Sequence, residues 1–285
     1  MRSSAASEGA ARLRTRLVAE GAPPVVAPFV YDGFQARLAQ QSGAEALYVT
    51  GFGTAASHGL PDVGLLGVGD MVSALERVVG VVDVPVVCDA DTGFGSPLNV
   101  ADTVLRYARA GAAALHIEDQ VWPKRCGFMA GKEVVPAADM VQKVRAAVEA
   151  SGEHGPVIIA RTDALASHGW DEAVERAESY REAGAELIFV DGIRSRRDAA
   201  DYAERLGHLP LVYNGLLPLE ETARLGFRLV LASGTLLAAA AALSAIYREL
   251  GETGAVQVDD PAGTFERINA TLGLDEVERL RERYG

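Results

Sequence analysis

Short runs of apolar, mostly β-branched residues recur eight times along the chain, with segments of helical spacing between them. The runs cover residues 25–30, 46–50, 84–89, 113–117, 157–160, 187–190, 211–213 and 229–232. The first and last begin 204 residues apart, about 29 residues per unit, which is close to one strand–helix–strand repeat. The runs are continuous rather than alternating, as expected for parallel strands buried on both faces.

The segments between the runs have the spacing of amphipathic helices. Apolar residues at 72, 75, 78 and 79 and at 140, 141, 144, 147 and 148 follow a helical period. Gly111, Gly184 and Gly226 precede the next strand, where a helix commonly stops. Eight strands with regular crossovers favour a (β/α)8 TIM barrel over an open doubly wound sheet.

The 285 residues are long enough for one large barrel domain. We expect an N-terminal segment over 1–22, the barrel strands within 23–234, and extra C-terminal helices within 235–285. No linker or low-complexity stretch indicates a second domain.

Composition excludes several classes of protein. The chain has 39 acidic against 27 basic residues and a net charge of −12, which argues against nucleic acid or an anionic membrane as partner. Its two cysteines cannot make a disulfide scaffold or a four-cysteine zinc site. We find neither a membrane-length apolar stretch nor an apolar N-terminal run, so we expect a cytoplasmic protein.

Acidic residues stand where the strands end. In a barrel of this class the chemistry gathers at the carboxyl ends of the strands. Four carboxylates are placed there: Asp89, Asp91, Glu118 and Asp191. A divalent cation would relieve their repulsion, and Mg²⁺ (or Mn²⁺) suits oxygen ligands. The alternative is a set of solvated loop acids. For Asp119 and Asp163 we expect structural roles, as loop caps or as partners of Arg161 and Lys124.

Two further features suit a small polyanion. Arg161 follows an apolar strand, and its guanidinium is shaped for a bidentate grip on a carboxylate; an ion pair with neighbouring acids is the alternative. The turn from Thr50 through Gly51 and Phe52 to Gly53 offers a hydroxyl and close backbone N–H groups for a second anionic group.

The loop after the fourth strand carries a cysteine, Cys126, directly after Lys124 and Arg125. These cations predict a depressed pKa for the Cys126 thiol. Gly127 and Gly131 would give the loop the freedom of a lid. Cys88 lies inside an apolar strand, and we interpret it as inert core.

These motifs together resemble the isocitrate lyase/phosphoenolpyruvate mutase superfamily. The resemblance spans residues 25 to 249 and rests on YVTGFG (48–53), GLPD (59–62), DADTGFG (89–95), EDQ (118–120), KRCG (124–127) and ARTD (160–163). The KRCG loop is similar to that of the branch containing 2-methylisocitrate lyase. The family implies a Mg²⁺-bound keto or hydroxy acid, a mobile loop carrying the cysteine, and a homotetramer (a dimer of dimers) whose C-terminal helices pack on a neighbouring subunit.

The resemblance also implies roles for individual residues. Metal ligands would be Asp89, Asp91 and Glu118; catalytic residues would be Cys126, Lys124, Arg161 and Tyr48; substrate contacts would come from Thr50, Gly51, Phe52, Asp62, Gly127, Phe128, Arg161, Asp191 and Asn214. Three departures favour a smaller or more hydrophobic substrate than the usual tricarboxylate. Phe128 replaces the usual histidine, Asp191 replaces a glutamate, and the loop after Asn214 lacks an acid and two glycines.

We therefore predict a Mg²⁺-dependent carbon–carbon lyase that cleaves a small 2-hydroxy di- or tricarboxylate of the 2-methylisocitrate or 2-alkylmalate type by retro-aldol chemistry. The alternatives within the superfamily are a phosphonomutase and an oxaloacetate-type hydrolase; a non-catalytic barrel is a further one. A nucleotide-dependent oxidoreductase is disfavoured, because the glycine pattern at 51–56 meets Pro61 where its helix should continue.

Overall fold

Eight parallel strands close into a barrel in chain order, β1-β2-β3-β4-β5-β6-β7-β8. The structure is a computed structural model that describes residues 2–19 and 21–285, so Met1 and Glu20 of the expected N-terminal segment lie outside it. The strands are β1 Val25–Val30, β2 Leu47–Val49, β3 Val86–Asp89, β4 Ala114–Glu118, β5 Val157–Thr162, β6 Leu187–Val190, β7 Leu211–Asn214 and β8 Leu229–Ala232. The predicted (β/α)8 barrel is confirmed. The third strand begins two residues later than expected, after Pro85, which has no N–H to donate to the ladder.

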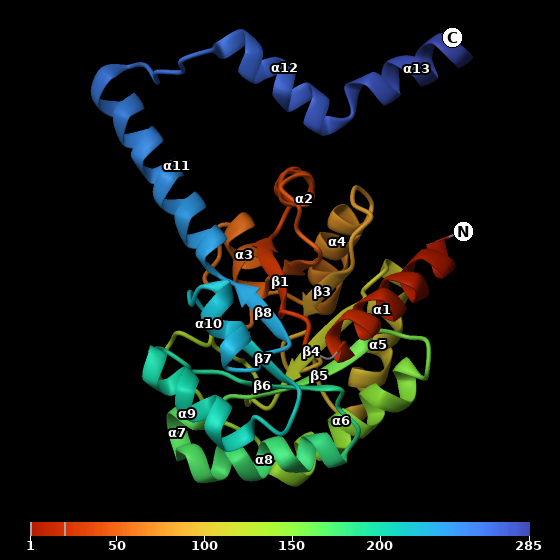
Figure 1. The fold of residues 1–285 in the computed structure, drawn as a ribbon, viewed down its shortest axis with the longest axis vertical. Helices are drawn as coiled ribbons and strands as arrows, with labels where there is room; N and C mark the ends of the chain where they lie inside the picture. Colours follow the sequence, from red (N-terminus) through yellow and green to blue (C-terminus); the bar gives the residue numbers. More distant parts are fainter. Residues whose placement is uncertain (1, 20) are drawn as a thin grey trace.

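Helices surround the barrel and extend beyond its last strand (Figure 1). They are α1 Arg2–Val18, α2 Gly33–Gln41, α3 Gly51–Ser57, α4 Val68–Val79, α5 Pro97–Ala110, α6 Ala137–Ser151, α7 Leu165–His168, α8 Trp170–Glu182, α9 Arg196–Leu206, α10 Leu219–Arg224, α11 Gly234–Thr253, α12 Pro261–Leu272 and α13 Leu274–Tyr284. In α5 the buried residues Val100, Val104 and Tyr107 form one face, and Gly111 ends the helix in the left-handed conformation (φ 99°), as its position in the sequence predicts.

The interior of the barrel is apolar at its base and charged at its mouth. Inward-facing Val87, Ile159 and Phe189 form one core cluster, which Leu13 of α1 also joins. Strand side chains alternate between faces, so the next inward positions toward the carboxyl ends are Asp89, Arg161 and Asp191. The barrel therefore places apolar side chains at its base and charged ones at the mouth of the same interior.

The C-terminal helices leave the barrel instead of covering it. In Figure 1 α11 runs away from β8, and α12 and α13 lie beyond its far end. Helix α12 contacts the rest of the chain at α2. There Arg37 donates to the Thr271 carbonyl (3.3 Å), and the Thr271 hydroxyl donates to Gln41 (3.0 Å). Among the described residues, none of the helices has the length and apolar character needed to cross a bilayer.

Candidate active site

A cavity of about 230 Å³ opens at the carboxyl ends of the strands. Twelve of the residues selected from the sequence line it: Tyr48, Thr50, Phe52, Asp62, Asp89, Lys124, Cys126, Gly127, Phe128, Arg161, Asp191 and Asn214. The other three, Gly51, Asp91 and Glu118, are buried beside it. The expected convergence of separate strand ends on one site is therefore present in the structure.

Asp89 is an acid of the site whose carboxylate is held by three hydrogen bonds. Its carboxylate accepts hydrogen bonds from the Tyr48 hydroxyl (3.3 Å), the Gly51 N–H (3.1 Å) and the Asp91 N–H (3.0 Å). Burial acts to raise the pKa of Asp89, but the basic groups around it, Lys124 among them, outweigh burial and lower the pKa to about 2. A Cβ on Gly51 would lie 2.7 Å from an Asp89 oxygen, so this approach needs glycine.

The neighbouring acids are held less firmly in the charged form. Burial, assisted by the charge of Asp89, raises the pKa of Asp91 to about 7 although Lys124 opposes it. Burial likewise raises the pKa of Glu118 well above its ordinary value, against the opposing charge of Arg161. Oxygen Oε1 of Glu118 has no hydrogen-bond partner among the described residues. Such a carboxyl group gains most from a nearby cation.

The donor set fits a divalent metal ion. One ligand atom each from Asp89, His116 and Glu118 lie within 4.8 Å of one another. Carboxylate oxygens suit Mg²⁺ or Mn²⁺, and a neutral imidazole is a common ligand for transition metals. The predicted ligands Asp89 and Glu118 are thus together. Asp91 adjoins Asp89, but its Oδ1 lies 2.6 Å from the Lys124 ammonium.

His116 is a polar site residue that the sequence prediction missed. Its Nε2 lies 2.7 Å from the Tyr48 hydroxyl, and burial lowers the pKa of His116 to about 4, so the ring is neutral at pH 7. The available signal is its place in β4, two residues before Glu118, which puts both side chains on the same face of the strand.

Arg161 forms ion pairs with neighbouring acids. The sequence left this open as the alternative to binding a substrate carboxylate. The Arg161 guanidinium makes two 2.9 Å hydrogen bonds to Asp163 and lies 3.2 Å from Glu118 and 3.6 Å from Asp191. Because Arg161 also lines the cavity, the pairing fixes its orientation there. The structural role expected for Asp163 as a partner of Arg161 is confirmed.

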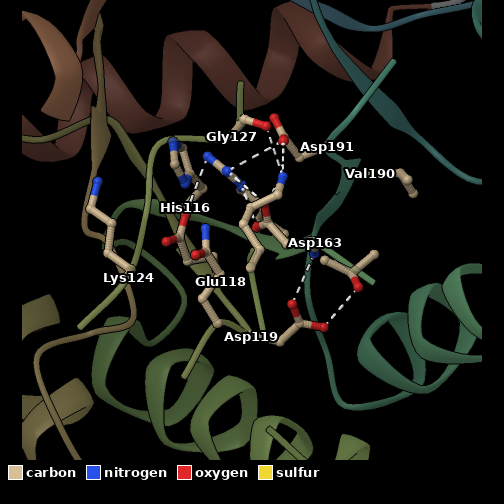
Figure 2. Close-up of polar contacts among 12 residues, drawn as sticks. His116, Glu118, Asp119, Lys124, Gly127, Asp163, Val190 and Asp191 are labelled. Carbon is tan, nitrogen blue, oxygen red and sulfur yellow. Dashed lines mark hydrogen bonds and ion pairs between the residues drawn. The ribbon is translucent and has the colours of Figure 1, made fainter. Parts of the chain in front are cut away.

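Asp119 has the structural role expected of it, but the cation that it pairs with is not the expected one. Figure 2 shows Asp119 at the edge of the cluster formed by Gly127, Asp163 and Asp191, which it joins by accepting a hydrogen bond from the Asp163 N–H (2.9 Å). It accepts hydrogen bonds from the Thr162 hydroxyl (2.7 Å), the Tyr180 hydroxyl (2.8 Å) and Arg176 (3.2 Å). The cation is therefore Arg176 and not Lys124.

The turn from Thr50 to Gly53 does not form the predicted anion nest. The Gly51 N–H donates to Asp89, and the Gly53 N–H donates to the Thr50 hydroxyl at 3.4 Å. Both donors are used within the protein because α3 begins here and Thr50 is its N-cap. Thr50 and Phe52 still line the cavity.

The prediction of a depressed thiol pKa is wrong. Cys126 is 8% exposed, and burial raises the pKa of its thiol. The Lys124 ammonium is bonded to Asp62 (2.6 Å) and Asp91 (2.6 Å), and Arg125 is exposed. The thiol is therefore protonated at neutral pH where it lines the cavity. Cys88 is buried in β3 as expected.

Apolar side chains form part of the cavity wall. Phe52, Phe128, Leu236 and Leu237 line it together with the charged groups. Leu236 and Leu237 come from the start of α11, which the sequence did not assign to the site. Phe128, which stands where the family usually has a histidine, is thus part of an apolar wall.

Comparisons with known proteins agree on one family. The model of the phosphoenolpyruvate phosphomutase family matches residues 13–250. The chain is 37% identical to 2,3-dimethylmalate lyase of Eubacterium barkeri, over 91% of this chain and 93% of that protein. It is 41% identical to 2-methylisocitrate lyase of Aeropyrum pernix, over 90% and 85% of the respective chains.

A solved structure of oxaloacetate acetylhydrolase in complex with 3,3-difluorooxalacetate superimposes with a TM-score of 0.90 at 35% identity, covering 96% of each chain. The predicted lyase and hydrolase activities both occur among these relatives, and the prediction of an enzyme, a carbon–carbon lyase, is confirmed by them. The chain therefore belongs to the phosphoenolpyruvate phosphomutase family, within the isocitrate lyase/phosphoenolpyruvate mutase superfamily.

Proposed function

We propose that this enzyme cleaves a 2-alkylmalate-like 2-hydroxy diacid by Mg²⁺-dependent retro-aldol chemistry. The observation that carries the proposal is the composition of one cavity: a protonated thiol, acids and an arginine face an apolar wall. A small diacid with an alkyl substituent matches both parts, because its carboxylates need cations and its alkyl group gains from apolar contact.

Asp89 and Glu118 would hold the metal ion, with His116 as a further donor. Asp91, beside Asp89, would complete the set of ligands that the sequence predicts. When bound, Mg²⁺ supplies Lewis-acid polarisation of the substrate oxygens. Arg161, held by Asp163, would orient a substrate carboxylate. Asn214 and Thr50 line the cavity and would complete the grip on the substrate.

The proton transfers would divide between two residues. The Tyr48 hydroxyl lies between Asp89 and His116, so it provides a route for the proton of the substrate's 2-hydroxyl group. Cleavage of the adjacent carbon–carbon bond then leaves a 2-keto acid and a carbanion on the second fragment. Cys126 would donate its proton to that carbon, which yields a saturated carboxylate and a thiolate. Lys124, beside Cys126 in the loop, would stabilise the negative charge.

The direct test measures lyase turnover with Mg²⁺ on 2-alkylmalates that differ in alkyl size, beside 2-methylisocitrate, oxaloacetate and phosphoenolpyruvate. We expect the highest kcat/KM with a 2-alkylmalate and formation of a 2-keto acid. Turnover of oxaloacetate alone would overturn the proposal in favour of the second candidate, a hydrolase, which the TM-score of 0.90 to oxaloacetate acetylhydrolase favours.

We further propose a homo-oligomer, a dimer of dimers, in which α11 packs on a neighbouring copy of the barrel. Of the described residues of α11 only Leu236 is buried, while Leu243, Ile246 and Leu250 are exposed. A groove whose lining includes Pro28 of β1 lies at the side of the barrel. An exposed apolar helix and an uncovered apolar groove on one chain suit exchange between copies.

Under this proposal residues 1–285 make one barrel domain with exchanged C-terminal helices. The cytoplasmic location stays a prediction from the sequence.

A further inference from the structure

Lys132 lies in the loop that carries Cys126, and its ammonium group is buried. Its side chain is 1% exposed. The ammonium donates to the Gly127 carbonyl (2.9 Å), to Asp163 (2.7 Å) and to Asp191 (2.8 Å). An ammonium has three N–H donors, so these acceptors satisfy it completely. The proposed reaction gives this residue no part.

The three acceptors belong to different parts of the fold. Gly127 follows Cys126 directly, Asp163 follows β5, and Asp191 follows β6. A Cβ on Gly127 would overlap the Asp191 carboxylate, so the loop backbone packs directly on that acid. Through the Lys132 side chain, Gly127 is therefore connected to the ends of two neighbouring strands. Figure 2 labels the three acceptor residues, Gly127, Asp163 and Asp191.

The rest of the loop is anchored at its base and on one side of its tip. Gln120 and Val134 form an isolated antiparallel bridge, and the Val121 N–H donates to the Glu133 carbonyl at 2.8 Å. At the tip the Cys126 N–H donates to the Asp62 carbonyl at 3.0 Å. On the side that faces β5 and β6, the tip is held by the buried Lys132 and by the exposed Arg194, which donates to the Phe128 carbonyl at 3.3 Å.

We propose that Lys132 is a positioning residue that locks the Cys126 loop over the cavity by pairing with Asp163 and Asp191. Substitution of Lys132 by an uncharged residue removes one cation from the buried carboxylates of Asp163 and Asp191, which is strongly unfavourable. The loop can relieve this only by moving and admitting water. The catalytic consequence rests on the proposed function, because it needs Cys126 to be the proton donor.

The test uses the two native cysteines as reporters. Cys126 faces the cavity, whereas Cys88 is buried inside β3. We expect Lys132→Met to increase the rate at which Cys126 reacts with 5,5′-dithiobis(2-nitrobenzoate) roughly tenfold or more. Removing a nearby positive charge would by itself raise the thiol pKa and slow this reaction, so an increase reports opening of the loop.

A matched control is Lys143→Met. Lys143 is another buried lysine, in α6, and its ammonium donates to the Thr92 carbonyl at 3.0 Å. This variant should leave the Cys126 labelling rate unchanged. Lys132→Arg keeps the charge and should restore part of the slow labelling.

Peptide mapping of the label distinguishes local opening from unfolding, because unfolding would also label Cys88. If Lys132→Met unfolds, Lys132→Gln is measured in the same way, since its amide still reaches toward the Gly127 carbonyl without a charge. A folded variant that labels Cys126 at the wild-type rate overturns the positioning role.

Turnover then reports on the proposed function separately. We expect kcat to fall about tenfold in Lys132→Met while KM changes less, because the loop carries the proton donor. Faster labelling with unchanged kcat would support the lock and contradict the acid role of Cys126.

Discussion

The Lys124 ammonium lies 2.6 Å from Asp91 Oδ1, so a cation of the Cys126 loop is paired with an acid that the sequence assigned to the metal. Both side chains are buried, at 4% and 3% exposure. The pairing links the loop to the segment after β3, and it places the charge of Lys124 beside Asp89 and Asp91. Metal binding and loop position should therefore influence each other.

The first prediction concerns the metal. Glu118→Gln and Asp89→Asn should each weaken Mg²⁺ binding by at least about tenfold, because each removes a charged oxygen donor from a buried site. Isothermal titration calorimetry, with and without oxalate, measures this. Glu153→Gln, on an exposed turn after α6, is the control and should leave the affinity unchanged. Equal affinities in all variants would contradict the assigned ligands.

The second prediction concerns the thiol. Cys126→Ser should lower kcat roughly 10²- to 10⁴-fold, the usual contribution of a positioned acid, while Mg²⁺ affinity changes little. The control, Cys88→Ser, removes the other thiol inside β3 and should retain the kcat of its folded fraction. Steady-state kinetics on both variants decides the matter, and wild-type turnover in Cys126→Ser would exclude the proposed proton donor.

The third prediction concerns substrate choice. Phe128 lines the cavity and is 57% exposed. Phe128→His should lower kcat/KM for a 2-alkylmalate about tenfold, because the apolar contact to the alkyl group is lost. The same substitution should raise kcat/KM for a substrate with a third carboxylate. Phe34→His, on α2, serves as the control; if both variants behave alike, Phe128 does not select the substrate.

The fourth prediction concerns pH and stability. Burial acts to raise the pKa of Asp163, but Arg161 and Lys132 outweigh it and hold the pKa well below its ordinary value. A depressed pKa means that the unfolded state binds the proton more readily, so the stabilisation is present above about pH 4 and is lost as the pH falls.

At pH 7 Asp163→Asn should therefore be less stable than the wild type by about 3–5 kcal/mol, and the difference should narrow below about pH 4. Chemical denaturation across this range measures it. A difference that is constant with pH would show that the Asp163 charge does not contribute.

The fifth prediction concerns assembly. Ile246→Glu on α11 should convert the oligomer to monomers, because burying a lone carboxylate in an apolar interface is unfavourable. Light scattering after size-exclusion chromatography measures the mass. Val258→Glu, in the segment between α11 and α12, should keep the wild-type mass. A monomeric wild type would contradict the proposed exchange.

The sequence alone determined the architecture. Eight continuous apolar runs and the glycines after the helices are local signals. Strands that are buried on both faces occur in few architectures other than a parallel sheet covered by helices. For the same reason the strand ends predicted where Asp89, Glu118 and Arg161 would meet, since the carboxyl ends of barrel strands share one face.

Tertiary structure decided the partners of these groups. The charges next to Cys126 in sequence suggested a lowered thiol pKa. In the structure Lys124 pairs with Asp62 and Asp91, and burial raises the thiol pKa instead. The contact of Lys132 with Asp191 joins residues 59 positions apart. Such pairings depend on the path of a loop and on desolvation, which local sequence patterns do not encode, so only the folded chain could specify them.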